Sequence, residues 1–155
     1  MPLLVKIAPD LSDEQVDAIA ELALSAGLDG IVAVNTTVDR EALTIADAAS
    51  LPEGGISGAP LKRRALEVLE RLHQAVGDQL VLISVGGIET PEDVWERVLA
   101  GATLVQAYTG FVYGGPGWPR RVNRALAARV RDSGRSSIQE LIGTGKPSGR
   151  VEAVR

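Results

Sequence analysis

The sequence has no cysteine and a single histidine among its 155 residues. The lack of cysteine excludes disulfides, thiolate nucleophiles and thiolate metal sites. The single histidine, His73, lies in the helix-forming stretch LEVLERLHQAVG, where we expect an ordinary surface residue. No second histidine is present to form a metal-binding pair with it, and a Ser–His–Asp triad has no suitable setting. We therefore predict no metal site.

Long apolar runs and an excess of positive charge are also missing. No run approaches the ~20 residues that a membrane-spanning helix needs, and the N-terminus has no signal-peptide pattern, so we expect this chain to be cytoplasmic. The formal net charge of −4 argues against nucleic acid or anionic lipid as the main partner. Five arginines gather in the last predicted helix, residues 118–131. We interpret them as a solvated outer face, because aromatic residues make up only 3% of the chain.

What is present is an alternation of strand-like and helix-like segments. The four apolar runs are residues 2–8, 30–36, 80–85 and 103–110, and a helical pattern follows each of them. This order predicts an α/β fold of parallel strands joined by right-handed crossovers. Both an open doubly wound sheet and half of an eight-stranded βα barrel fit it, although no GxGxxG fingerprint follows the first strand. We expect one domain over residues 1–143 and a mobile C-terminal tail over 144–155.

Candidate binding residues follow the strands, where parallel α/β folds bind their ligands. Gly86 and Gly87 end the third strand, and this pair serves either as a plain turn or as bare backbone that approaches a phosphate. Lys6 is either an edge lysine that reaches water or a cation that faces a ligand. Asn35 and Thr36 either cap the second strand or bind a planar, amide-like substrate. The loop over residues 37–59 is long enough to be functional or disordered.

Five motifs in one order give the chain a family resemblance. VKIAPDL, NTT followed by DR, GGISGAPL, SVGGIETPEDVWERVLAGA and VQAYTGFVYGGP resemble dihydroorotate dehydrogenase of the quinone-dependent class. The resemblance implies strands five to eight of a TIM (β/α)8 barrel that contains FMN. It also implies a flavoprotein oxidoreductase of pyrimidine (UMP) biosynthesis, which oxidises (S)-dihydroorotate to orotate and passes electrons to a quinone. Such enzymes are peripheral to the cytoplasmic membrane.

The resemblance also implies the role of each site residue. Lys6 would lie beside the flavin ring, and Val34 would contact FMN through its backbone. Asn35 and Thr36 would bind the orotate ring. Four more residues would hold FMN, the first two through backbone amides and the last two around its phosphate: Gly58, Gly87, Tyr108 and Thr109.

In this family the serine base and the segment that admits the quinone belong to the preceding part of the chain. No catalytic base is therefore assigned here, and we expect the chain alone to be weakly active or inactive. The alternative is an inactive half-barrel module that binds FMN or another phosphorylated ligand. Exposed strand edges lead us to expect self-association or pairing with an N-terminal half.

Overall fold

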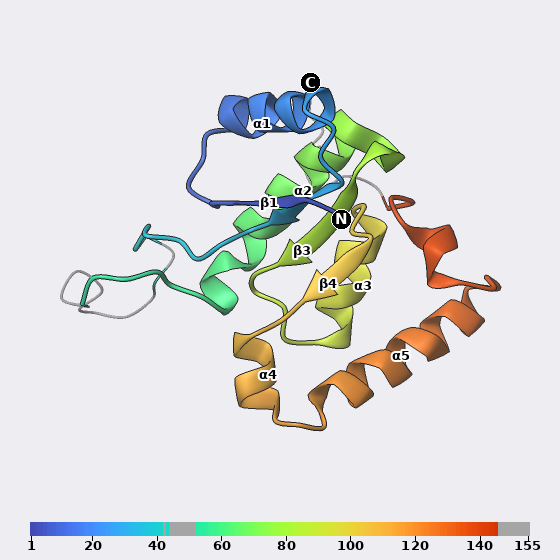
Figure 1. Ribbon diagram of the computed structural model, residues 1–155. Helices are drawn as coiled ribbons and strands as arrows, with labels where there is room; N and C mark the ends of the chain where they lie inside the picture. Colours follow the sequence, from blue (N-terminus) through green and yellow to red (C-terminus); the bar gives the residue numbers. More distant parts are fainter. Residues whose placement is uncertain (42, 44–51, 146–155) are drawn as a thin grey trace, which may run out of the picture.

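In the computed structural model, residues 1–41, 43 and 52–145 are described. The four strands are β1 (Leu4–Ile7), β2 (Gly30–Ala33), β3 (Val81–Val85) and β4 (Leu104–Gln106). They form one parallel sheet in the order β1-β2-β3-β4, so neighbours in the chain are neighbours in the sheet (Figure 1). This arrangement confirms the predicted parallel βα repeats and places the C-terminal ends of all four strands at one edge.

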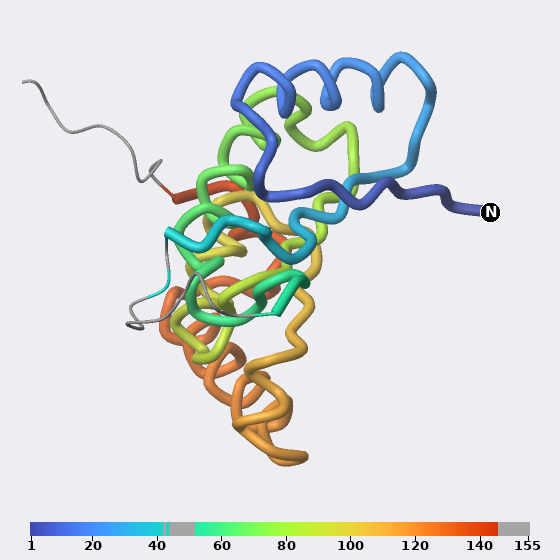
Figure 2. Tube along the Cα trace, turned by 90° about the vertical axis from the view of Figure 1, so that its left-hand side faces the viewer, coloured from blue at the N-terminus to red at the C-terminus, as the bar shows by residue number. Residues whose placement is uncertain are grey.

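Five α-helices belong to the described residues. They are α1 (Asp13–Ser25), α2 (Lys62–Val76), α3 (Pro91–Leu99), α4 (Thr109–Gly114) and α5 (Trp118–Asp132). α1 lies at one end of the sheet, and α4 and α5 lie at the other (Figures 1 and 2). Side-chain caps begin two of these helices: Ser12 forms a capping box with Gln15, and Thr90 forms one with Asp93.

The structure adds short elements to the predicted order and corrects the end of the fourth strand. A 3₁₀ turn, Ala59–Leu61, precedes α2 and contains Pro60. β4 ends at Gln106, because Thr109 already begins the short helix α4, which we did not predict. A further 3₁₀ turn, Ile138–Leu141, follows α5. The run over residues 103–110 predicts one strand, because the end of a strand and the start of a short helix can contain the same β-branched and aromatic residues.

The sheet has one covered face and one open face. Side chains alternate along each strand, so Ile31 and Leu82 turn toward the helices and are buried there. Leu69 and Leu72 of α2 belong to the same core. On the opposite face Leu104 is 56% exposed. Within the described residues this face of the sheet is uncovered, and it borders the C-terminal edge at which ligands of such folds bind.

His73 is not the ordinary surface residue that we expected. It is half-buried in α2, and a Cβ on either Gly101 or Gly143 would lie 2.2 Å from its ring. Gly143 donates its N–H to the Val98 carbonyl, and Gly145 donates to Leu99, so the chain is held against the end of α3 up to Gly145. The rest of the predicted tail, residues 146–155, lies outside the described residues. A single histidine in a helical pattern does not reveal this contact, because both glycines come from distant segments.

The arginines of α5 lie on its outer side, as predicted, with one exception. Arg129 is half-buried, pairs with Glu92 and lies over the Trp95 ring. The other four are exposed: Arg120, Arg121, Arg124 and Arg131. Every helix within the described ranges is too short or too polar to cross a lipid bilayer.

Candidate functional site

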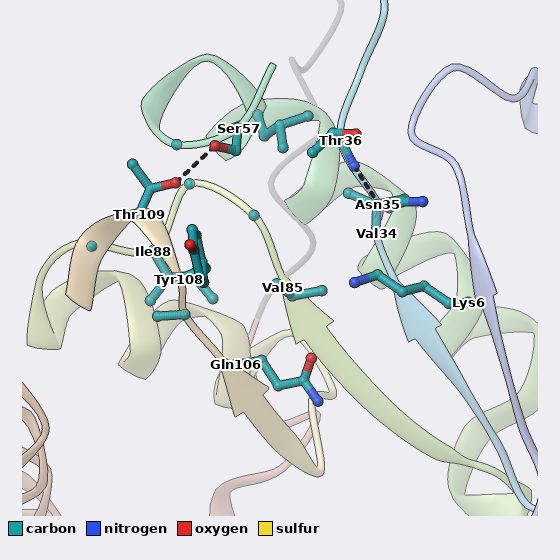
Figure 3. A pocket seen from close by; sticks show the side chains of 16 residues that line it. Lys6, Val34, Asn35, Thr36, Ser57, Val85, Ile88, Gln106, Tyr108 and Thr109 are labelled. Carbon is teal, nitrogen blue, oxygen red and sulfur yellow. Dashed lines mark hydrogen bonds between the residues drawn. The ribbon is translucent and has the colours of Figure 1, made fainter. Parts of the chain in front are cut away.

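A pocket of about 630 Å³ opens at the C-terminal edge of the sheet (Figure 3). It receives residues from the ends of all four strands and from the loops that follow them. All eight residues predicted to bind cofactor or substrate line it: Lys6, Val34, Asn35, Thr36, Gly58, Gly87, Tyr108 and Thr109. Residues that are more than a hundred positions apart in the chain thus meet in one cavity, with a volume typical of sites for small molecules.

The β1 and β2 side of the pocket carries the polar side chains of Lys6, Asn35 and Thr36. Lys6 lies on the open face of β1, is exposed, and extends its ammonium group toward β3 (Figure 3). The chain beyond β2 is fixed by two backbone bonds, from Val34 to the Val85 carbonyl at 2.9 Å and from Asn35 to the Ile7 carbonyl at 2.7 Å. The side-chain oxygen of Asn35 accepts the N–H of Thr36 at 2.9 Å, which fixes the orientation of its amide group.

The opposite rim is built from backbone that only glycine permits. Gly87 has φ +68°, and a Cβ there would lie 2.3 Å from Cα of Lys62. Gly58 has φ +83°, and its Cβ would lie 2.9 Å from the methyl group of Thr109. Any residue other than glycine would be strained at these positive φ values, and the close contacts leave no room for a side chain. The rim therefore presents bare main chain to the pocket.

The start of α4 completes this rim. The hydroxyl groups of Ser57 and Thr109 are hydrogen-bonded at 2.8 Å (Figure 3). Gly110 packs directly against the loop after β3, since a Cβ on it would lie 2.2 Å from the Ile88 carbonyl oxygen. Trp118 donates its indole N–H to the Glu89 carbonyl at 2.6 Å and holds α5 to the same loop. The loops after β2, β3 and β4 are thus joined into one wall.

An ionised carboxylate lies behind the glycine rim. Asp93 is buried, pairs with Lys62, and accepts the N–H groups of Glu89 and Thr90 at 2.9 Å each. Burial raises the pKa of Asp93, but the hydrogen bonds from Lys62, Glu89 and Thr90 outweigh it and hold that pKa below its ordinary value of 3.8. The hydrogen bond with Asp93 in turn raises the pKa of Lys62. This group fixes the start of α3 and lies outside the pocket lining.

The chemistry of the lining suits an anionic, partly planar ligand. Of the described residues that line the pocket, only Lys6 carries a charge, and none is acidic. Apolar side chains such as Val85 and Ile88 supply a surface for a flat ring, while the glycine rim leaves backbone N–H groups room to approach an anion. The close packing of Gly58 on Thr109 and of Gly87 on Lys62 keeps this rim free of side chains, so the residues present fit a flavin mononucleotide.

The predicted set missed two polar residues of the pocket. Gln106, the last residue of β4, pairs in register with Val85 and lies on the open face. Its signal was present, because a polar residue within an apolar run is also what singled out Lys6. In the sequence Ser57 is simply part of the motif GGISGAPL, and its bond to Thr109 depends on tertiary contacts that no local pattern contains.

Comparison with known proteins identifies the family. The family model for dihydroorotate dehydrogenase matches residues 1–130. The chain is 63% identical over 145 residues to the dihydroorotate dehydrogenase (quinone) of Thermobifida fusca, covering 92% of this chain and 38% of that protein. It is 56% identical over 155 residues to the corresponding protein of Nocardia farcinica, covering 99% of this chain and 42% of the relative.

Solved structures agree with the sequence relatives. The crystal structure of the Eimeria tenella enzyme in complex with ferulenol matches with a TM-score of 0.85 and 40% identity, over 92% of this chain and 38% of that one. The ligand-free form from the same organism gives a TM-score of 0.84. The chain spans about two fifths of the length of these relatives, and its four βα units are part of their TIM barrel, which confirms the predicted fold class. The chain belongs to the dihydroorotate dehydrogenase family.

Proposed function

We propose that this chain provides the FMN- and orotate-binding part of a quinone-dependent dihydroorotate dehydrogenase of pyrimidine biosynthesis. The observation that carries the proposal is the single pocket that gathers all eight family-derived site residues. The relatives named dihydroorotate dehydrogenase (quinone) support the reaction type. For the whole protein, the quinone acceptor and association with the membrane surface are part of the same proposal.

The glycine rim would hold the phosphate of FMN. Backbone N–H groups near Gly58 and Gly87 would donate to the phosphate oxygens, and Tyr108 and Thr109 would close around them. Backbone donors need no side-chain ordering on binding, so this end of the ligand is held by a preformed site. Val34, at the end of β2, would contact the cofactor through its main chain.

Lys6, Asn35 and Thr36 would serve the reacting rings. When bound, FMN supplies the acceptor for the hydride of dihydroorotate and passes the electrons to a quinone. The Lys6 ammonium would stabilise negative charge on the flavin ring. The amide of Asn35, already oriented by the Thr36 N–H, would bind the planar carbonyl and N–H edge of orotate.

A second function, binding of FMN without turnover, is favoured by the open side of the pocket. Lys6 and Gln106 are both exposed, so within the described residues water has access to the place where the rings would react. Transfer of a hydride is best protected where water is excluded. This access of water is consistent with the prediction that the chain alone is weakly active or inactive, which remains to be tested.

Two measurements on the 155-residue chain test these functions. We expect FMN to bind with quenching of its fluorescence, to bind more tightly than riboflavin, and to show a changed absorption spectrum when orotate is added. A dihydroorotate–quinone assay then separates the enzyme from the binding module. Failure to bind FMN, or equal affinity for FMN and riboflavin, would overturn the proposed phosphate site.

A further inference from the structure

The guanidinium group of Arg97 is fully buried behind the glycine rim. Arg97 belongs to α3, has an exposure of 0%, and lines no part of the pocket. Its Nη2 donates to the Lys62 carbonyl at 2.6 Å and to the Gly86 carbonyl at 3.2 Å. An arginine side chain is almost never fully buried unless its guanidinium group is paired, because removing the charge from water costs free energy.

The bond to Gly86 has a direct geometric consequence for Gly87. The carbonyl of Gly86 and the N–H of Gly87 belong to one peptide group, and the only cis bond among the described residues joins Ala33 and Val34. In a trans peptide the C=O and N–H bonds point in opposite directions. Because Arg97 holds the Gly86 oxygen on the helix side, the Gly87 N–H turns to the opposite side. Gly87 lines the pocket there.

The second bond of Arg97 ties this loop to the start of α2. Gly87 packs against Lys62 so closely that a Cβ on Gly87 would lie 2.3 Å from the Cα of Lys62. One guanidinium nitrogen thus joins both sides of this close contact. The loop is held from behind by a side chain that the pocket does not contain.

The charge of Arg97 adds to this effect. Burial lowers its pKa to about 10, against the opposing influence of Glu96, Asp93 and Glu70, so the group is charged at neutral pH. Its Nε and Nη1 have no hydrogen-bond partner among the described residues. A positive charge in a region of low dielectric constant attracts an anion on the other side of the loop more strongly than an exposed one does.

We propose that Arg97 is a positioning residue for the phosphate end of the ligand. It orients the Gly87 N–H through the Gly86 carbonyl and places a buried positive charge behind the rim. This inference rests on the proposed function, since it names the group that shapes the phosphate site. It predicts an effect that depends on the phosphate and not on the flavin ring.

The test compares FMN with riboflavin on the 155-residue chain. We expect Arg97→Met to weaken FMN binding about tenfold or more, the loss of at least one hydrogen bond to a charged group, while riboflavin affinity changes less than about twofold. Arg129→Met is the matched control. Arg129 is half-buried on α5, pairs with Glu92 and lines no part of the pocket, so its substitution should leave both affinities unchanged.

Arg97→Lys keeps the inference testable if Arg97→Met does not fold. Lysine retains the charge but lacks the planar fork, so we expect the preference for FMN over riboflavin to fall about threefold, less than in Arg97→Met. An unchanged preference in a folded Arg97 variant would overturn the inference while leaving the proposed function intact. Absence of any preference for FMN in the unmodified chain would overturn the proposed function itself, and the inference with it.

Discussion

The hydroxyl groups of Ser57 and Thr109 lie 2.8 Å apart and join segments that are 52 residues apart in the chain. Ser57 belongs to the glycine-rich segment before α2, and Thr109 begins α4. Next to this bond, Gly58 approaches the Thr109 methyl group so closely that no side chain fits between them. The glycine rim is therefore assembled across the ends of different strands, and its shape depends on this contact.

Removal of either hydroxyl group should loosen the rim. We expect Ser57→Ala and Thr109→Val each to weaken FMN binding about three- to tenfold, the effect of one hydrogen bond of 0.5–1.5 kcal/mol. Because both variants break the same bond, the double variant should bind about as well as either single one. Titration of FMN fluorescence measures all three affinities. Effects that simply add would mean that the two hydroxyl groups act independently.

Gly87→Ala should impair both folding and binding. The new Cβ would overlap the backbone of Lys62 and require a positive φ, which we expect to lower the free energy of unfolding by about 2–4 kcal/mol. Gly27→Ala is the matched control. Gly27 has φ +67° with nothing within 4 Å of its Cβ, so it should lose only about 1–2 kcal/mol and keep FMN affinity. Urea denaturation of both variants measures the difference, and equal losses would argue against the close contact.

Lys6→Met should act on the flavin ring and not on the phosphate. Lys6 is exposed, so its substitution should change the free energy of unfolding by less than about 0.5 kcal/mol. Loss of the charge should weaken binding of chemically reduced FMN about fivefold, and of oxidised FMN less, because the ring is more negative when reduced. Riboflavin should show the same change, in contrast to the Arg97 variants.

Arg124→Met removes an equal charge from the exposed side of α5 and serves as the control for Lys6→Met. It should leave the affinity for both oxidation states unchanged. Should Lys6→Met also have no effect on reduced FMN, the ammonium group would not lie beside the ring.

Asp93→Asn should remove an acid-sensitive part of the stability. The folded-state pKa of Asp93 lies below 3.8, so the unfolded chain binds this proton first as the pH falls. The contribution is therefore complete above pH 3.8 and is lost as the pH drops through the lower, folded-state value. The variant should be about 1–3 kcal/mol less stable at neutral pH, with a shallower loss of stability in acid.

Circular dichroism at several pH values follows the unfolding of the Asp93 variant. Asp132→Asn, an exposed position at the end of α5, should behave like the unmodified chain. An Asp93→Asn profile parallel to that of the unmodified chain at all pH values would show that another carboxylate causes the acid sensitivity.

The sequence predicted what depends on local patterns and on family motifs. Four apolar runs follow from residue spacing, and each of them contains one strand of the structure. It did not predict that Gln106 faces the pocket, that His73 is enclosed by Gly101 and Gly143, or that Arg97 lies behind the rim. Each of these contacts joins segments that are distant in the chain, where spacing carries no information.

Amide NMR of the isotope-labelled chain during titration with FMN tests the phosphate site most directly. We expect the largest chemical-shift changes at the backbone N–H groups of Gly58, Gly87 and Thr109, and smaller changes at the same groups when riboflavin replaces FMN. Changes of equal size with both ligands, or changes confined to residues outside the pocket, would contradict the central claim that bare main chain at the strand ends binds the phosphate.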